Sequence, residues 1–533
     1  MQMKIQTPFY LLNVIVVVIF LLVLRAGQFR SANTDDEFFQ CLLFKSDNAT
    51  LISQVVYSPN NISYTSVLQF SINNLRFTSP STPKPRYIVT PVDEFQIQTV
   101  VYCSKKHGLE IRTRSGGHDF EGLSYVSQVP FVILDLINLR SITVDTQTAT
   151  AWVQAGATLG ELYYAIAQKS QNLGFLGGIC YALGLGGHVS GGGYGAMMRK
   201  YGLAADNVVD AQFINVHGRI LDRKSMGEDL FWAIRGGGGS SFGIILSLKI
   251  KLVPVPETVT VFTIDRTLEQ NLTKIILKWQ HVAPKIDKDL NIRVLMFSIV
   301  NPSTGNRTIR ATFDTLFLGG INRLLPLMQE EFPELGLTRE DCTEMSWIES
   351  VVVGSGFTNG EPVEVLLNRT ALPKNSIKGR SDFATHPISE DGFEGIWEFY
   401  NDKIGAGMAL LVLTPYGGKM DEIPESAIPF PNRLGTLYMI EYVVAWDGDE
   451  TSPNISWIRN LYNYTASYVS NSPRTSYLNY NDLDLGVGKT YQEASSTWGA
   501  NYFKNNFDRL VKVKTMVDAG NFFKREQSIP TRS

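Results

Sequence analysis

Three glycine-dense segments lie close together in the first half of the chain and constrain its fold more than any other feature. A backbone without Cβ atoms lets several N–H groups approach one ligand, and a diphosphate is the anion usually bound in this way. The alternative is a set of tight turns or bulges. Three clusters within 130 residues, two of them with a histidine, favour a ligand site: Arg114-Ser-Gly-Gly-His118, Gly184-Leu-Gly-Gly-His-Val-Ser-Gly-Gly-Gly-Tyr-Gly195 and Arg235-Gly-Gly-Gly-Gly-Ser-Ser-Phe-Gly243.

Other well-known ligand motifs do not fit these segments. Gly184 to Val189 lacks the third glycine of G-x-G-x-x-G and follows no clean first strand, so Asp206 is not expected to bind a ribose. The full P-loop pattern G-x-x-x-x-G-K-S/T does not occur. Neither H-E-x-x-H nor C-x-x-C occurs, so we expect no metal site. A net charge of −3 gives nucleic-acid binding no electrostatic driving force.

The N-terminus predicts entry into the secretory pathway. Lys4 precedes a nearly unbroken apolar run from Phe9 to Leu24, and small residues follow, so we interpret residues 1–30 as a signal peptide. Arg25 leaves a signal anchor as the alternative, although the run is short for a span of about 20 residues. No later segment is apolar enough to cross a membrane. The final location would be an ER-derived vesicle, the vacuole or the cell exterior. Seven candidate glycosylation sequons agree with this route: Asn48, Asn61, Asn271, Asn306, Asn368, Asn454 and Asn463.

Changes in pattern divide the remaining chain into a lead-in (31–80), a first block (81–256), a middle block (257–475) and a C-terminal segment (476–533). In the first block strands alternate with helices. Phe131–Leu136 predicts a buried strand, the Thr158/Glu161 capping box a helix to about Ser170, and the alternation over Leu246–Leu252 a half-exposed strand.

The middle block predicts an antiparallel sheet with helices on one face. Its long strands are expected at 258–264, 290–300, 309–318, 406–414 and 434–446, with helices near 267–282 and 320–332. Helical spacing over 501–518 predicts a closing helix. The chain is therefore expected to have an α+β fold.

Several long motifs together resemble those of the plant berberine bridge enzyme-like flavoproteins, and the resemblance runs from about Cys41 to Pro530. It implies an FAD-linked oxidoreductase with a two-part FAD-binding domain of the vanillyl-alcohol oxidase (PCMH) type, which residues 476–533 complete. The antiparallel sheet would form the substrate domain. The motifs are Arg112 to Ser124, Gly178-Ile-Cys180 with the second glycine cluster, Lys200 to Asp210, Gly227 to Gly239, Tyr477 to Asp484, and Gln527 to Pro530.

The resemblance implies that FAD is attached twice, through His118 to the 8α-methyl group and through Cys180 to C6. Both substituents withdraw electrons, which favours uptake of a hydride. His188 matches the family histidine near the N1–C2 carbonyl end, where a positive donor would stabilise the reduced flavin. The other predicted cofactor-binding residues are Arg114, Ser115, Gly116, Gly117, Gly186, Gly187, Gly192, Tyr194, Gly195, Gly238 and Asn479.

The resemblance also assigns the other three cysteines. Cys41 and Cys103 match the pair that forms a disulfide in the family. With Cys180 on the flavin, Cys342 would remain as a free, buried thiol.

The predicted catalytic base is Glu441. It lies with Met439 on one side of an alternating strand, opposite the apolar side chains of Tyr438, Ile440, Tyr442 and Val444. A buried carboxylate is unfavourable unless it is used or paired, and burial raises its pKa toward neutrality. The alternative is a glutamate exposed on an open sheet face. Tyr480, on a strand after the substrate domain, matches the family's second acid/base candidate; its alternative role is core packing.

The family resemblance also suggests the substrate. Glu at position 441 is found in alkaloid-oxidising members, whereas Gln is common in carbohydrate and monolignol oxidases. Met439 replaces a lysine of alcohol-oxidising relatives, and Phe120 replaces a common tyrosine. Tyr181-Ala-Leu183 replaces Pro-Thr-Val, in which the smaller valine favours reaction with O2, so Leu183 argues against fast O2 use.

We therefore expect hydride abstraction next to nitrogen in a plant alkaloid, such as a tetrahydroprotoberberine or dihydrobenzophenanthridine, with O2 reduced to H2O2. Two alternatives remain open. One is oxidation of an oligosaccharide or aromatic alcohol. The other is a flavin-carrying binding or storage glycoprotein without turnover.

Overall fold

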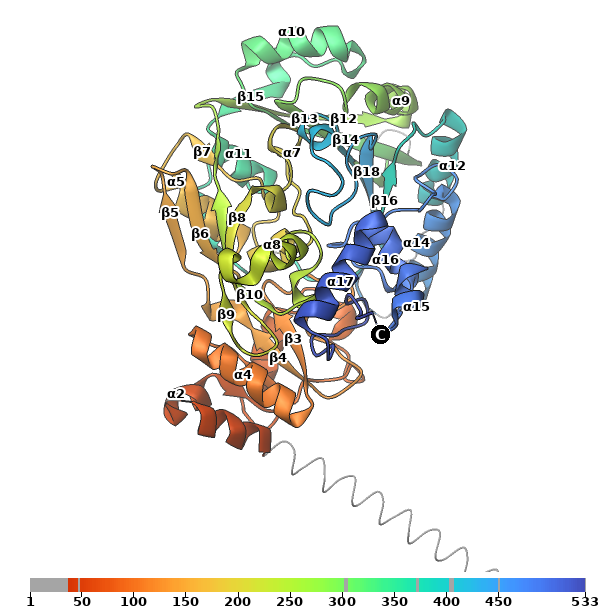
Figure 1. Ribbon diagram of the computed structural model, residues 1–533. Helices are drawn as coiled ribbons and strands as arrows, with labels where there is room; N and C mark the ends of the chain where they lie inside the picture. The colour runs from red at the N-terminus through yellow and green to blue at the C-terminus, as the bar shows by residue number, and fades with distance from the viewer. Residues whose placement is uncertain are drawn as a thin grey trace, which may run out of the picture.

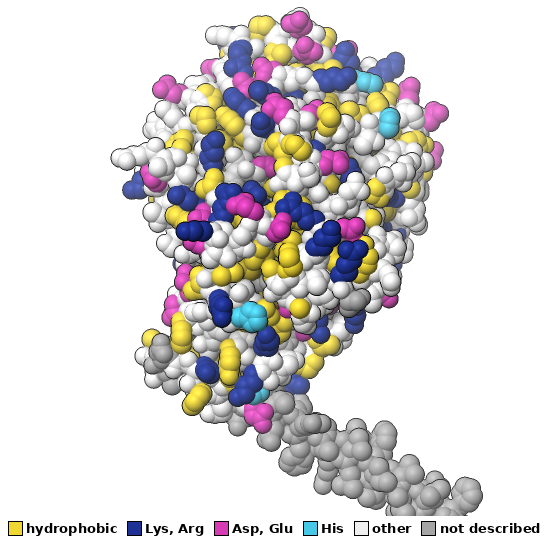
Figure 2. Space-filling view, viewed as in Figure 1, with side chains coloured by type: hydrophobic (Ala, Val, Ile, Leu, Met, Phe, Trp, Pro, Cys, Tyr) yellow, Lys and Arg dark blue, Asp and Glu magenta, His cyan; other side chains and the backbone are white. Residues whose placement is uncertain are grey.

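The computed structural model describes residues 37–46, 48–301, 305–370, 373–401, 407–448 and 451–532 (Figure 1). The predicted signal peptide lies outside these residues. Within them no helix is both long and apolar enough to span a bilayer. On the face shown in Figure 2, cationic and anionic side chains are interspersed rather than gathered by sign, as the near-zero net charge suggests.

The first layer of the FAD half is a four-stranded sheet in the order β1 (Val56–Tyr57), β2 (Tyr87–Val89), β4 (Phe131–Asp135), β3 (Glu110–Arg114). Strands β2, β4 and β3 are parallel, and β4 is buried at every position, as its apolar sequence predicts. Because β3 ends at Arg114, the first glycine cluster begins at the carboxyl end of a parallel strand, where open α/β sheets commonly bind ligands.

A disulfide fastens the start of the described chain to this layer. Helix α4 (Glu94–His107) begins at Asp93, whose side chain accepts a hydrogen bond from the Gln96 backbone N–H. Cys103 on α4 is bonded to Cys41 in the helical residues 37–45. The pairing implied by the family resemblance is therefore present.

The second layer is a five-stranded antiparallel sheet in the order β5 (Ile142–Asp145), β6 (Thr150–Gln154), β10 (Ile244–Lys251), β8 (Val208–Ile214), β9 (Ile220–Leu221). The half-exposed strand predicted over 246–252 is confirmed in its second part, where Lys249 is half-buried and Lys251 is exposed between buried apolar residues. The first part differs from the prediction, because Ile244 to Leu248 are all buried. Helix α5 (Leu159–Ala167) does begin with the Thr158/Glu161 capping box, but it ends at Ala167.

The substrate half is an antiparallel sheet, as predicted, but it has seven strands, because β15 (Cys342–Met345) and β16 (Ser376–Ala384) join the five that were expected. Its order is β15, β12 (Val259–Thr267), β14 (Arg307–Phe317), β13 (Leu290–Val300), β17 (Met408–Pro415), β18 (Tyr438–Trp446), β16. One face packs against α9 (Leu272–Val282), α10 (Ile321–Glu331), α12 (Glu390–Asn401) and α14 (Thr451–Thr465) around a single apolar core. The other face turns toward the FAD half.

The C-terminal segment returns to the FAD half, where α17 (Phe507–Val517) packs beside α8 (Arg223–Ala233) (Figure 1). The single closing helix predicted over 501–518 is broken. Helix α16 (Trp498–Phe503) ends before Lys504, whose φ of 46° cannot continue a right-handed helix. Tyr480 lies in a turn rather than on the expected strand.

Two surface predictions need correction. Asn454 is fully buried near the start of α14, packed beside Gly407, so its side chain is closed to a glycan; the other six sequon asparagines are exposed. Cys342 is a free thiol as expected, but it is half-exposed because β15 is the edge strand of its sheet.

Candidate active site

A cavity of about 600 Å³ lies where the two halves and the C-terminal segment meet. All three glycine clusters line it, together with the loop that carries Cys180. The inward face of the seven-stranded sheet forms the opposite wall, and Tyr477 to Asn481 close one side. The tertiary structure thus gathers segments that are up to about 400 residues apart in the chain.

Most of the predicted site residues border this cavity, but two do not. Those that do are His118, Cys180, His188, Glu441, Tyr480, Ser115, Gly116, Gly117, Gly186, Gly187, Tyr194, Gly195, Gly238 and Asn479. Gly192 lies outside the cavity lining, near Phe430 and Leu203. Arg114 also lies outside it and has a structural role.

Arg114 points away from the cavity because side chains alternate along β3. Thr113 and Ser115 face the cavity, whereas the Arg114 guanidinium is fully buried and binds Asp135 Oδ2 through Nε at 3.0 Å and Nη2 at 2.6 Å. Its Nη1 donates to the Leu68 carbonyl at 2.9 Å. The arginine therefore fixes the end of β3 rather than the ligand.

The backbones of the first two glycine clusters are in direct contact. A Cβ on Gly116 would lie 2.4 Å from the Gly184 nitrogen, and one on Gly184 would lie 2.0 Å from Ser115 Oγ. Only glycine permits this approach. It places the His118 loop against the residues that follow Cys180.

The two predicted attachment residues both face the cavity. Burial lowers the pKa of His118 to about 4, so its imidazole is neutral near pH 7. Cys180 is a free thiol whose pKa is raised by burial. A neutral imidazole has a ring nitrogen with a free lone pair and can act as a nucleophile, whereas the thiol must first lose its proton.

The loop around Cys180 is held at consecutive carbonyl groups. The Tyr163 hydroxyl donates to the Gly178 carbonyl and Ser355 Oγ donates to the Ile179 carbonyl, each at 2.8 Å. The Gly160 N–H donates to the Tyr181 carbonyl at 2.8 Å. Because helix α5 and the segment after α11 (Trp347–Gly354) both contribute, the thiol is presented by a rigid backbone.

His188 is held as a hydrogen-bond acceptor. The Gly178 backbone N–H donates to its Nε2 at 3.2 Å, and burial lowers its pKa to about 4. The expectation of a positive donor at this position is therefore not supported: the imidazole is neutral, and Nε2 is occupied as an acceptor.

Glu441 lies on the cavity face of β18, directly opposite Ser381 of β16 and Val412 of β17. Burial raises its pKa to about 7, although Tyr480 and the charge of Arg293 act in the opposite direction. The alternation along β18 is as predicted, since Tyr438, Ile440, Tyr442 and Val444 join the helix-side core. The alternative of an open, exposed sheet face is excluded.

Arg293 is a site residue that the sequence reasoning missed. It lies on the cavity face of β13, with Nη2 2.6 Å from Asp314 Oδ2 on β14. A lone arginine inside the apolar strand 290–300 was the signal that could have identified it. Its charge lowers the pKa of Glu441, but the opposite effect of burial is larger.

A group of aromatic side chains surrounds Tyr480. Its hydroxyl forms a short hydrogen bond with that of Tyr194, and its ring stacks on Phe120 with centroids 5.4 Å apart. The hydroxyl of Tyr477 accepts from the Gly193 N–H and from Asn479 Nδ2, each at 2.9 Å. Burial raises the pKa of both Tyr194 and Tyr480, so both are protonated near neutral pH.

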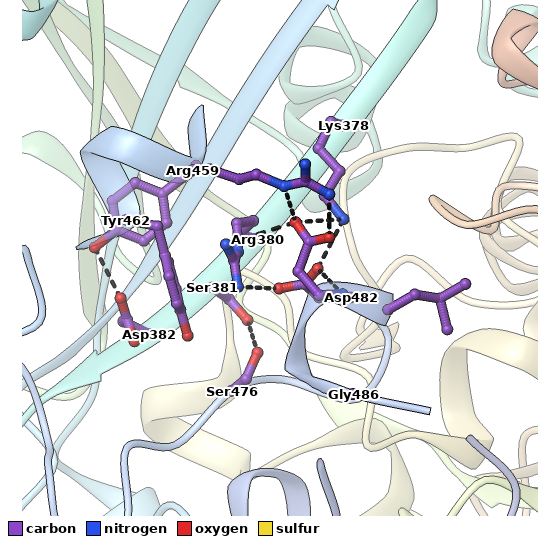
Figure 3. A network of polar contacts seen from close by, with 12 residues as sticks. Lys378, Arg380, Ser381, Asp382, Arg459, Tyr462, Ser476, Asp482 and Gly486 are labelled. Carbon is purple, nitrogen blue, oxygen red and sulfur yellow. Dashed lines mark hydrogen bonds and ion pairs between the residues drawn. The ribbon is translucent and has the colours of Figure 1, made fainter. Parts of the chain in front are cut away.

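A buried ionic network supports this side of the site (Figure 3). Lys378 on β16 binds Glu121 and lies 2.7 Å from Asp482 Oδ1. Arg380 Nη2 lies 2.6 Å from Asp482 Oδ2. Glu121 adjoins Phe120, and Asp482 is two residues from Tyr480. The network therefore joins the loop after the first glycine cluster to the C-terminal segment.

The polar atoms at the cavity fit a large polar cofactor. Buried groups in native proteins are rarely left without a hydrogen-bond partner. Six buried polar atoms without a hydrogen-bond partner belong to residues that line this cavity. They are Ser124 Oγ, Asn291 Oδ1, Thr315 Oγ1, Thr414 Oγ1, Asn481 Nδ2 and Arg525 Nε. Together with the glycine backbone, they offer the donors and acceptors that FAD requires.

Comparisons with known proteins agree with this site. Residues 85–223 match the FAD binding domain family and residues 476–530 match the "Berberine and berberine like" family. The chain is 53% identical to tetrahydroberberine oxidase of Berberis wilsoniae over 94% of both chains. It is 48% identical to a monolignol oxidoreductase of Arabidopsis thaliana, over 97% of this chain and 98% of that one.

Solved structures give the same result. BBE-like #28 from Arabidopsis thaliana has a TM-score of 0.87 and 46% identity, over 93% of this chain and 100% of that chain. Berberine bridge enzyme from Eschscholzia californica has a TM-score of 0.86 and 38% identity, over 93% and 99%. The chain therefore belongs to the berberine bridge enzyme-like family of FAD-binding oxidoreductases.

Proposed function

We propose that this protein is an alkaloid oxidase of the secretory pathway that removes a hydride from a carbon next to nitrogen. The observation that carries the proposal is Glu441, a carboxylate with a pKa of about 7 on the inner wall of an otherwise largely apolar site. A base with this pKa is matched to a substrate ammonium or ring proton near neutral pH. Tetrahydroberberine oxidases of two plants are among the relatives.

The sheet wall would bind the alkaloid through apolar contact. Leu295, Leu410 and Val412 line the cavity beside Glu441 and offer a surface for a fused aromatic ring system. Glu441 would accept the proton from the substrate nitrogen. Bound FAD would supply the two-electron acceptor, retained through His118 and Cys180.

Tyr480 would act next to Glu441 as a second proton carrier. Its hydroxyl interacts with both the Glu441 carboxylate and the Tyr194 hydroxyl, so a proton accepted by Glu441 has a continuous polar route away from the substrate. The Phe120 ring prevents Tyr480 from turning away. Dioxygen would accept the electrons and form H2O2.

A second candidate is oxidation of an aromatic alcohol. A monolignol oxidoreductase is 48% identical to this chain, and the paired hydroxyls of Tyr194 and Tyr480 would offer hydrogen bonds to an alcohol. Glu441 and Met439 favour the alkaloid, because a carboxylate attracts a cationic amine and Met439 adds no positive charge. A grass pollen relative described as a glucose dehydrogenase makes sugars a third class to assay.

Anaerobic mixing of the purified protein with a tetrahydroprotoberberine, a dihydrobenzophenanthridine, coniferyl alcohol and glucose tests the proposal. Bleaching of the flavin absorbance is expected with an alkaloid and should be slowed in Glu441→Gln. Bleaching by the alcohol or the sugar alone would contradict it. No bleaching by any compound would favour a binding or storage role.

Two further steps complete the proposal. N-terminal sequencing of the secreted chain is expected to begin after about residue 30, and glycan mapping to find sugars among the six exposed sequons but none on Asn454. Intact mass after denaturation is expected to include one FAD. That mass should be lost only when His118 and Cys180 are both replaced by alanine.

A further inference from the structure

Arg525 is a half-buried cation whose guanidinium has no hydrogen-bond or ion-pair partner among the residues that the structure describes. It lies in the C-terminal segment and lines the cavity, and its Nε has no hydrogen-bond partner. Within the described residues no ion pair joins its guanidinium to a carboxylate. Arg112, whose charge also acts on Arg525, by contrast binds both Glu110 and Glu526 at 3.1 Å. Withdrawing a guanidinium from water without a counter-charge is unfavourable, so an anion beside the buried Nε of Arg525 would stabilise it.

Asp119 is a carboxylate of the same cavity lining whose charge acts on Arg525, but it forms no ion pair with it. Asp119 Oδ1 accepts a hydrogen bond from the Glu121 backbone N–H at 2.8 Å. The interaction of Asp119 with Arg525 is coulombic and involves no hydrogen bond. Burial raises the pKa of Asp119 and lowers that of Arg525. In a close ion pair the opposite charge would lower the pKa of the aspartate and raise that of the arginine. The opposite directions show that burial outweighs the attraction between these two groups.

The position of Arg525 indicates which anion it meets. A Cβ built on Gly238 would lie 3.6 Å from Arg525 Nη2, so the guanidinium borders the third glycine cluster. Asp119, which interacts electrostatically with Arg525, directly follows the first glycine cluster. Both clusters are segments whose backbone N–H groups suit an anionic ligand.

FAD carries its negative charge on the diphosphate. We propose that Arg525 is the side-chain counter-ion of the FAD diphosphate, supplied to the FAD half by the C-terminal segment. The segment then contributes both Tyr480, at the reacting end of the cavity, and the charge that retains the cofactor. The inference depends only on FAD binding and holds for any substrate.

The test uses the full chain with His118→Ala and Cys180→Ala, so that FAD binds reversibly and its Kd can be titrated by flavin fluorescence. Adding Arg525→Met is expected to raise the Kd for FAD about 10- to 100-fold, the range for loss of a charged hydrogen bond. The Kd for riboflavin, which has no phosphate, is expected to stay unchanged. Arg525→Lys should retain most of the affinity for FAD. Lys524→Met removes an exposed cation next in the chain and is the matched control.

The competing explanation is that Arg525 serves only to stabilise Asp119. The pair Asp119→Asn with Arg525→Met removes both charges and leaves neither one orphaned, so it also protects against a failure to fold. We expect it to bind FAD more weakly than Asp119→Asn alone. Equal FAD affinity of these two variants would overturn the proposal. So would equal weakening of FAD and riboflavin, which would report a change in pocket shape.

Discussion

The rings of Phe120 and Tyr480 lie 13° from parallel with their centroids 5.4 Å apart, although 360 residues separate them in the chain. Gly379 makes this stack possible, because a Cβ there would lie 2.3 Å from the Phe120 ring. The flanking residue Lys378 holds the loops that carry both rings through Glu121 and Asp482. The stack, the glycine and the ion pairs thus act together to position Tyr480 over the cavity.

Replacing Lys378 tests this support. Lys378→Met leaves two buried carboxylates without their shared cation, so we expect a loss of about 3 to 5 kcal/mol in the free energy of unfolding. Denaturant unfolding measures it. Arg459→Ala is the control: it removes a half-exposed partner of Asp484 in the same network and should cost about 1 kcal/mol or less. Similar losses in the two variants would contradict the central role of Lys378.

The pH dependence of turnover tests Glu441. With a pKa of about 7, the carboxylate is ionised only above neutrality, so kcat/KM for an alkaloid should rise as the pH passes through about 7. Glu441→Gln should remove this limb and lower kcat by about 100- to 10,000-fold. If kcat/KM of the glutamine variant still rises near pH 7, the titrating group is not Glu441.

The same carboxyl group also makes stability depend on pH. Its folded pKa of about 7 lies above the unfolded value of about 4.3, so the folded state binds more protons between these values. The free energy of unfolding should therefore fall as the pH rises from about 4 to 7. Glu441→Gln is expected to flatten that part of the curve. Unfolding midpoints at several pH values provide the comparison.

The Cys41–Cys103 disulfide closes a long loop and should contribute to stability. The cysteines are 62 positions apart in the chain, and loop-closure entropy predicts about 4 kcal/mol for a loop of this length. The double variant Cys41→Ala, Cys103→Ala should unfold at correspondingly lower denaturant concentration. Cys342→Ala, which removes a half-exposed free thiol, should leave the midpoint nearly unchanged.

Leu183 tests access of oxygen to the cavity. Its side chain lines the cavity three residues after Cys180, where the family resemblance links a smaller valine with faster use of O2. Leu183→Val should raise the rate of flavin reoxidation by O2 about tenfold, or about 1.4 kcal/mol in barrier. The rate of anaerobic reduction should not change. Stopped-flow mixing of the reduced enzyme with O2 separates the two steps.

Patterns that depend on neighbours in the chain were predictable. The strands 290–300 and 434–446 and the capping box at Thr158 follow from side-chain periodicity and short-range hydrogen bonding, and both act over a few residues. Predictions failed where distant segments decide. In strand β10 the alternation correctly predicts the exposed side at Lys249 and Lys251, but it cannot reveal that both faces are covered from Ile244 to Leu248.

The site shows the same division. The glycine clusters and Glu441 identify themselves in the sequence, because a backbone without side chains and a carboxylate on a core strand each have few explanations. The sequence alone also determined the family. Only the tertiary structure decided that Arg114 is structural, that His188 is a neutral acceptor, and that Arg293 and Arg525 face the cavity. The direction of a side chain and its counter-charges depend on contacts between segments hundreds of residues apart, and chain order does not encode these contacts locally.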